Sequence, residues 1–262
     1  MILGLLPLVF FVVAVVLFRR RRQPVLRSLG FSFGRWSAVD AAVGLAIPAI
    51  AFTAIFLTER ALNAIRVEAG TITWASFVTD VLVQLFFAAL LEELIYRVGL
   101  LSGVAASLAR VPFGRWIAVL VTGALFGIAH LDNEGATWVA ALGTGLGGVI
   151  YGIAFLATRS IVLPLFLHLS WNMSEGLFGF PISGHLVPGF ATSEGVGPVS
   201  ITGGEYGPEA GIPGLIARFL VIALVLVYVK LRWPQGSIAR LEFAPDPARR
   251  SDRTAVSAAD AG

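Results

Sequence analysis

The stretch VQLFFAALLEELIYRVGLL, residues 83–101, sets the main constraint on the fold. Most of it is apolar enough to cross a membrane, yet Glu92, Glu93 and Arg97 lie within six residues of one another. An ionisable side chain at the centre of a bilayer costs about 2.5–3.5 kcal/mol on insertion scales. A purely structural segment would avoid that cost, so we interpret this stretch as a membrane helix that carries a functional site.

The composition of the whole chain supports a membrane protein. Hydrophobic residues make up 57% of the 262 residues and charged residues 13%, whereas a soluble domain is about 25% charged. The chain has no cysteine, which excludes disulfides, thiolate metal sites and a cysteine nucleophile. The net charge of +3 does not indicate a nucleic-acid partner, because the basic residues cluster beside apolar spans, as membrane topology requires.

Several apolar segments approach the roughly 20 residues that a membrane span needs. They are residues 2–18, 39–58, 74–101, 116–130, 137–158, 160–179 and 214–231. The sequence therefore predicts an all-α, polytopic transmembrane bundle of about seven to eight helices over residues 1–232, with a catalytic core at about 74–180. The stretch 74–109 is long enough for one protruding or kinked helix, or for two helices. We expect residues 233–262 to form a disordered cytoplasmic tail.

The basic residues also predict an orientation in the cell membrane. Residues 19–22 are four arginines that directly follow the first span, whereas a cleaved signal peptide carries its positive charge before the apolar run. Because cytoplasmic loops are enriched in Lys and Arg, we expect the N-terminus outside and the C-terminal tail in the cytoplasm. Loop 180–213 has no Lys or Arg and should lie outside, with an irregular structure because it is rich in Gly, Pro and Ser.

Helix geometry separates the two adjacent glutamates. Glu93 and Arg97 are four residues apart with the acid first, which is the favoured order for an ion pair. Glu92 lies about 100° further round the helix, on the face of Tyr96, without a cation on its own helix. A desolvated carboxylate of this kind suits a general base. The alternative is that both glutamates pair with Arg97.

Phe126 and His130 are four residues apart on the next predicted span. A turn at residues 110–114 separates this span from the one that carries Glu92, and Glu92 and His130 lie at equal sequence distances from it. In an antiparallel hairpin, equal distances from the turn mean equal depth. We therefore expect Glu92 and His130 to face each other.

His168 and Asn172 project from one face of the span 160–179, because they are also four residues apart. Together they offer two hydrogen-bond donors that can stabilise an oxyanion, or they form hydrogen bonds between helices. Glu175, on a neighbouring face, either contributes to the site or is a charge at the helix end. We expect His185 to be a solvated loop residue.

The span 137–158 is rich in glycine. Gly143 and Gly147, and likewise Gly148 and Gly152, form small-xxx-small pairs. Such pairs allow helix backbones to approach closely in lipid, so we expect this span to pack tightly against its neighbours.

Three motifs in predicted spans resemble those of the CPBP family, the CAAX proteases and bacteriocin-processing enzymes, also called the Abi family. They are EExxxR at Glu92–Arg97, FxxxH at Phe126–His130 and HxxxN at His168–Asn172. They occur in the family's order, and the resemblance covers about residues 85–180. It implies an all-helical intramembrane glutamic endopeptidase related to the type II CAAX prenyl protease, the Ras-converting enzyme.

The resemblance also implies roles for the matching positions. Glu92 and His130 would activate a water molecule, and His168 and Asn172 would form the oxyanion hole. The supporting residues that we expect are Glu93, Arg97, Phe126 and Tyr96. The implied reaction needs no metal or other cofactor, and its substrate is a membrane-anchored or membrane-associated peptide or protein.

Several alternatives stay open on the sequence. A zinc metalloprotease could use ligands drawn from Glu92, Glu93, His130 and His168. A membrane scaffold or immunity protein could keep the fold without turnover. A proton-coupled transporter could use buried Glu and His as a relay, although no inverted halves are visible. The GxSxG match at residues 30–34 lacks the strand before it that a nucleophile elbow needs, so we regard it as a chance match.

Overall fold

The computed structural model describes residues 2–232, so the predicted tail at 233–262 lies outside the described residues. The α-helices are α1 (Ile2–Arg20), α2 (Val25–Ser28), α3 (Ser37–Ala61), α4 (Trp74–Ser76), α5 (Val83–Glu93), α6 (Ser102–Ser107), α7 (Gly114–Ile128), α8 (Trp138–Thr158), α9 (Val162–Phe178), α10 (Val199–Thr202) and α11 (Ile212–Arg232). The π-helical segments are η1 (Phe77–Leu82) and η2 (Leu94–Leu101), the 3-10 turns are η3 (Gly204–Tyr206) and η4 (Pro208–Ala210), and the strands are β1 (Ile65–Ala69) and β2 (Ala191–Gly195).

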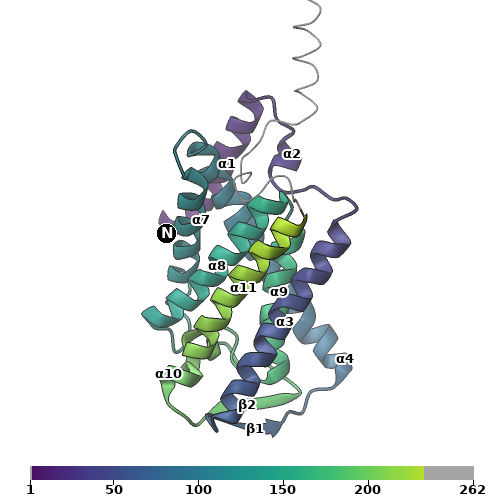
Figure 1. The fold of residues 1–262 in the computed structure, drawn as a ribbon, viewed down its shortest axis with the longest axis vertical. Coiled ribbons are helices and arrows are strands. Elements are labelled where there is room, and N and C mark those ends of the chain that lie inside the picture. The colour runs from purple at the N-terminus through teal and green to yellow at the C-terminus, as the bar shows by residue number, and fades with distance from the viewer. Residues whose placement is uncertain (1, 233–262) are drawn as a thin grey trace, which may run out of the picture.

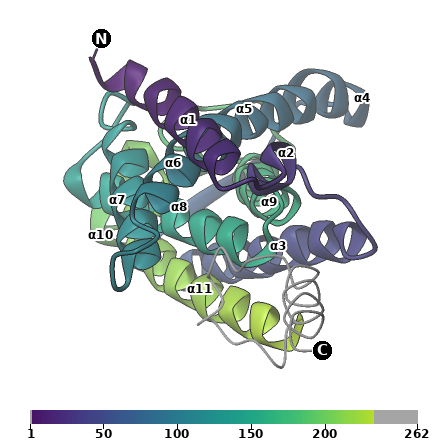
Figure 2. The same ribbon diagram turned by 90° about the horizontal axis from the view of Figure 1, so that it is seen from above.

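The predicted all-α bundle is confirmed, and the predicted spans are helical in the structure (Figure 1). Four helical stretches within the described residues are long and apolar enough to cross a membrane: Ser37–Ala61, Trp74–Ser107, Trp138–Thr158 and Ile212–Arg232. α7 is a shorter apolar helix. Seen from above, α9 lies in the interior, where α3, α5 and α8 pack around it (Figure 2). Most of its side chains are buried, because neighbouring helices cover it on several sides.

The stretch 74–107 is one continuous helix, which decides between the one-helix and two-helix possibilities. Two of its segments, η1 and η2, are π-helical, and η2 begins directly after Glu93. A π-helical turn shifts the backbone hydrogen-bond register and occurs often at functional sites. Within this irregular part, the Ser102 hydroxyl donates to the Arg97 carbonyl at 3.0 Å.

α1 packs across the end of this long helix. A Cβ added at Gly103 would lie 2.2 Å from the Phe10 carbonyl oxygen, so only glycine fits at this crossing. Arg21 then donates from Nη2 to the Ala106 carbonyl at 3.2 Å. The four arginines at residues 19–22 therefore lie at the end of the bundle where the long helix finishes.

α7 and α8 approach closely through glycine, as the small-xxx-small pattern predicted. A Cβ on Gly148 would lie 2.8 Å from the Gly123 Cα, and a Cβ on Gly127 would lie 2.0 Å from the Ala141 carbonyl oxygen. The other predicted pair, which includes Gly147, faces the C-terminal part of the chain instead of α7. The contact at Gly127 holds the last turn of α7 against the first turn of α8.

The loop between α9 and α11 corrects one expectation. Residues 180–213 were expected to be irregular, but they contain β2, α10, η3 and η4. β2 pairs antiparallel with β1, with Ile65 opposite Gly195, and Arg66 forms an ion pair with Glu194 at 3.1 Å. The hydrogen-bond partners come from a segment far away in the sequence, so local composition could not reveal this sheet.

We expect Gly127→Ala to destabilise the protein, because the new Cβ must displace the backbone at Ala141. Overpacking of this kind costs typically about 1–3 kcal/mol. The measurement is thermal unfolding of the purified protein in detergent. Gly34→Ala is the control, because a Cβ there meets no atom within 4 Å. Equal unfolding temperatures for the two variants would contradict the close contact between α7 and α8.

Candidate active site

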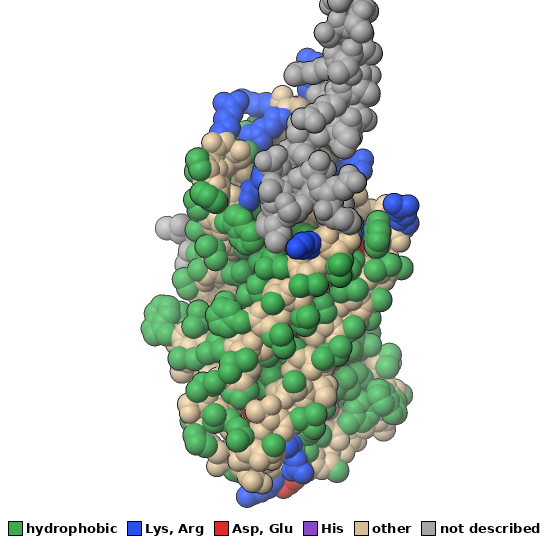
Figure 3. All heavy atoms as spheres, viewed as in Figure 1, with side chains coloured by type: hydrophobic (Ala, Val, Ile, Leu, Met, Phe, Trp, Pro, Cys, Tyr) green, Lys and Arg blue, Asp and Glu red, His purple; other side chains and the backbone are tan. Residues whose placement is uncertain are grey.

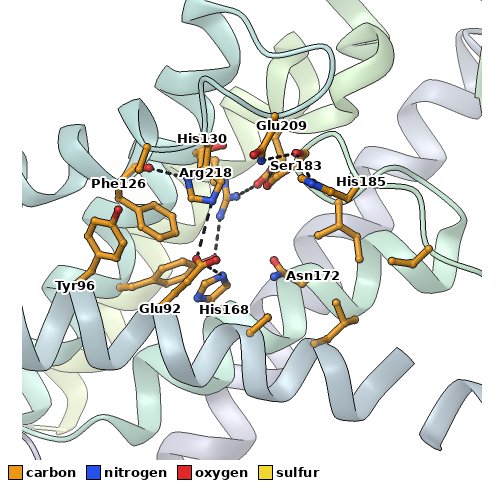
Figure 4. A pocket seen from close by; sticks show the side chains of 18 residues that line it. Glu92, Tyr96, Phe126, His130, His168, Asn172, Ser183, His185, Glu209 and Arg218 are labelled. Atoms are coloured by element: carbon orange, nitrogen blue, oxygen red, sulfur yellow. Dashed lines mark hydrogen bonds and ion pairs between the residues drawn. The ribbon is translucent and has the colours of Figure 1, made fainter. Parts of the chain in front are cut away.

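A cavity of about 420 Å³ lies inside the bundle and brings the candidate residues together (Figure 4). Glu92, His130, His168 and Asn172 all line it. Their side chains come from the long helix, from the turn after α7 and from α9. Of the four expected supporting residues, Tyr96 and Phe126 also line the cavity, whereas Glu93 and Arg97 lie buried behind it.

Glu92 and His130 face each other across the cavity. Glu92 Oε2 lies 4.0 Å from His130 Nε2, which is too far for a direct hydrogen bond but suits a bridging water. His130 Nδ1 lies 2.7 Å from the Phe126 carbonyl oxygen. A carbonyl only accepts, so Nδ1 carries the proton, and Nε2 of the neutral ring is an acceptor directed at Glu92.

Glu93 pairs with Arg97, as the four-residue spacing predicted, and Glu92 does not. Arg97 Nε lies 3.2 Å from Glu93 Oε2, and both side chains are buried. The other carboxylate oxygen, Oε1, lies 3.0 Å from His168 Nδ1. The four-residue spacing predicted only the partner Arg97. The contact with His168 joins residues 75 positions apart on different helices, so no local sequence pattern indicates it. Glu93 thus joins the long helix to α9.

The buried Arg97 guanidinium has partners on several sides. Nη2 donates to the Gly148 carbonyl at 3.2 Å. The guanidinium carbon also lies 4.8 Å from the Phe126 ring centroid and 5.0 Å from the Tyr151 ring centroid. Aromatic faces attract a cation most strongly where water is excluded. These contacts compensate the charge and connect the long helix to α7 and α8.

His168 is held between the two glutamates. Nδ1 contacts Glu93, and Nε2 lies 3.7 Å from Glu92 Oε2. Its ring stacks on Tyr151, with centroids 4.7 Å apart and planes 16° apart. An ionised Glu93 can only accept, so Nδ1 carries a proton. To donate from Nε2 as well, His168 must carry both protons. Asn172 lies one turn further along α9, on the same cavity.

A second buried ion pair lines the cavity, and the sequence analysis missed it. Arg218 of α11 pairs with Glu209 of η4. The guanidinium stacks over the Trp171 ring at 3.5 Å, and Nη1 donates to the Tyr151 hydroxyl at 3.3 Å. Ser183 in turn donates to Glu209. A lone arginine within the predicted span 214–231 was the available signal, because such a charge requires a buried partner.

Two other side chains have defined places near the cavity. His185 is exposed in its loop, as expected, and it also lines the cavity. Glu175 is buried in α9 and accepts a hydrogen bond from Trp171 Nε1 at 3.2 Å, so it is not a surface charge at the helix end. Within residues 2–232, no group of three or more His, Asp or Glu side chains is arranged to hold a metal ion.

The fold and the site define a polytopic helical membrane protein with an ionisable site in a cavity inside the bundle. Residues 73–174 match the family model described as type II CAAX prenyl endopeptidase Rce1-like. The match is consistent with the CPBP resemblance and supports, at the family level, a CAAX-type intramembrane protease. No curated protein and no solved structure matches the chain.

We expect Arg218→Met to be strongly destabilising, because it leaves the Glu209 carboxylate buried without its cation. Breaking a buried pair costs about 3–5 kcal/mol. In a double-mutant cycle, the variant with both Glu209→Gln and Arg218→Met should lose far less unfolding free energy than the sum of the losses in the two single variants. Unfolding in mixed micelles of increasing denaturing detergent measures the three free energies.

The matched control for this cycle is Arg66→Met, because Arg66 pairs with Glu194 at the exposed surface. Exposed pairs contribute at most about 1 kcal/mol. Two results would contradict an energetic coupling between Glu209 and Arg218. One is additive losses of unfolding free energy in their cycle, and the other is an equal loss for Arg66→Met and Arg218→Met.

Proposed function

We propose that this protein is an intramembrane endopeptidase that hydrolyses a peptide bond of a membrane-anchored or membrane-associated polypeptide. One observation carries the proposal: Glu92 Oε2 lies within 4.0 Å of Nε2 of both His130 and His168, at the wall of one cavity. The Glu92 side chain as a whole is 33% exposed, and its Oε2 atom is buried at the cavity wall. Glu92 Oε2 has no hydrogen-bond partner among the described residues.

In the proposed mechanism, Glu92 and His130 act together on one water molecule. The water donates one hydrogen to Glu92 Oε2 and the other to His130 Nε2, which leaves a lone pair free to attack the scissile carbonyl carbon. As the new C–O bond forms, Glu92 takes the proton. General base help of this kind is worth about 10²–10⁴-fold in rate.

His168 and Asn172 act on the other side of the carbonyl. When the carbonyl π bond opens, its electron pair moves to the oxygen, and the oxyanion accepts hydrogen bonds from His168 Nε2–H and from the Asn172 amide. One such donor is worth about 10²–10³-fold. Collapse of the intermediate breaks the C–N bond, and Glu92 returns its proton to the leaving amine.

Glu93 and Arg97 support this mechanism without touching the substrate. Glu93 accepts from His168 Nδ1 and thereby sets the ring orientation, while Arg97 holds the second carboxylate oxygen. In the proposed oxyanion contact, His168 carries a proton on each ring nitrogen, with Nδ1–H donating to Glu93 and Nε2–H to the oxyanion. The reaction so described uses no metal or other cofactor.

A zinc enzyme is the second candidate, because Glu92, His130 and His168 are residue types that bind zinc and line one cavity, although within the described residues they are not arranged to hold a metal ion. The two candidates differ in their response to a chelator. A strong chelator leaves a glutamic peptidase unaffected, and it inactivates a zinc enzyme until zinc is restored.

We expect Glu92→Gln to reduce peptide cleavage by about 10²–10⁴-fold, because the amide keeps the shape of the side chain but cannot take a proton. The measurement is cleavage of membrane-anchored peptides, prenylated and unprenylated, by the purified protein in detergent, with and without a strong chelator. Glu68→Gln is the matched control, because Glu68 is exposed on β1. It should cleave at the rate of the unsubstituted protein.

Each outcome of this assay decides one question. Full activity in Glu92→Gln would refute the site assignment. Loss with chelator and recovery with zinc would move the mechanism to a metal centre. No cleavage of any peptide by the unsubstituted protein would favour a scaffold or immunity role over a peptidase for this panel of substrates.

A further inference from the structure

The two ends of the bundle differ in charge. One end, which we name the basic end, carries most of the described Lys and Arg residues (Figure 3). They are Arg19, Arg20, Arg21, Arg22, Arg27, Arg35, Arg110, Arg115, Arg159, Lys230 and Arg232. Arg60 and Arg66 are the described basic residues at the opposite end, and Arg97 and Arg218 are buried inside the bundle.

The opposite end, which holds β1, β2 and α10, is acidic, and we name it the acidic end (Figure 1). Its loops, strands and short helices carry Glu68, Asp132, Glu134, Glu194 and Glu205. Lys and Arg accumulate on the cytoplasmic side of membrane proteins, so the basic end is the cytoplasmic one.

The direction of the helices agrees with this orientation. α1, the helix 74–107, α8 and α11 each run toward the basic end, where arginine or lysine follows or closes the helix. α3, α7 and α9 each run the other way. The long helices of the described chain therefore alternate in direction between the two ends.

The catalytic cavity lies toward the acidic end. Of the residues that line it, Asn133, Ser183, His185 and Glu209 belong to the loops and turns of that end. Asn133 donates from Nδ2 to the Ser183 carbonyl at 2.8 Å and so ties two of these loops together beside the cavity. The exposed side chain of His185 stands at its edge (Figure 4).

The loop after α9 borders the cavity on this side. Ile182, Ser183 and His185 face the catalytic cavity, whereas Pro181 and Gly184 face a second hollow of about 410 Å³. That hollow opens among residues of the acidic end, including Glu134, Glu194 and Glu205. Residues of one short segment, 181–187, thus line both the catalytic cavity and a hollow at the acidic end of the bundle.

We propose that the catalytic cavity opens on the non-cytoplasmic side of the membrane, and that its substrate is a polypeptide whose scissile bond emerges on that side. This inference rests on the proposed function. The cavity wall combines apolar Leu85 and Val187 with polar Ser183 and Glu209. Such a wall offers both apolar and polar contacts to a polypeptide. A cytoplasmic C-terminus would lie on the wrong side of the bilayer.

Single cysteines test the orientation directly, because the natural chain has none. His185→Cys reports on the edge of the cavity, Ser200→Cys on the acidic end and Gly34→Cys on the basic end, and all three positions are exposed. The probe is a membrane-impermeant maleimide added to intact cells. We expect His185→Cys and Ser200→Cys to react, and Gly34→Cys to react only after permeabilisation.

The reverse pattern, with Gly34→Cys labelled in intact cells and the other two protected, would overturn the proposal. Protection of His185→Cys alone, with Ser200→Cys labelled, would also overturn it, because the cavity would then be closed from the acidic end. Labelling of each purified variant in detergent verifies that its thiol can react.

A second arm tests the side of cleavage. Two membrane-anchored reporters carry the same cleavable segment, one on the non-cytoplasmic and one on the cytoplasmic side, with the unsubstituted protein or Glu92→Gln. We expect at least tenfold more cleavage of the non-cytoplasmic reporter, and none by Glu92→Gln. Preferential cleavage of the cytoplasmic reporter would overturn the inference.

The two arms separate this inference from the proposed function. Labelling does not depend on catalysis, so an inactive protein with His185→Cys labelled from outside would refute the peptidase and leave the orientation standing. Cleavage by the purified protein together with the reverse labelling pattern would refute the orientation and leave the peptidase standing.

Discussion

The site depends on one buried carboxylate, that of Glu93, which forms an ion pair with Arg97 and a hydrogen bond with His168. A charge removed from water costs several kcal/mol unless it is paired and hydrogen-bonded, so this carboxylate constrains everything that packs around it. Arg97 in turn donates to the Gly148 carbonyl, which places α8. The long helix, α8 and α9 therefore meet in a geometry that leaves Glu92, the neighbouring glutamate, directed into the cavity.

Tyr151 connects this network to the second buried ion pair. Its ring stacks on His168, its face lies 5.0 Å from the Arg97 guanidinium, and its hydroxyl accepts from Arg218. Arg218 and Glu209 thereby link α11 and the loop after α9 to the same ring. The network extends past residues 73–174, the part of the chain that matches the Rce1-like family. The C-terminal helix contributes to the cavity as well as to the bundle.

Contacts within one helix were predictable because helix geometry fixes them. The Glu93–Arg97 pair follows from a four-residue spacing, and the tight packing of α8 follows from its glycine pairs. Contacts between distant segments were not predictable in the same way. The hydrogen bond between Glu93 and His168 and the ion pair between Arg218 and Glu209 join residues on different elements. No periodicity within one segment of the sequence predicts such contacts.

The sequence by itself determined that this chain is a helical membrane bundle, because its composition leaves too little polar surface to face water. It also determined which polar residues lie on the same face of a helix, because the rise and turn of a helix are local properties. Only the tertiary structure decided that residues 74–107 form one helix, that Glu93 bridges to α9, and that the loop after α9 lines the cavity at the acidic end. Those features depend on which distant segments pack together, since a buried polar group must find its partner wherever the fold brings one.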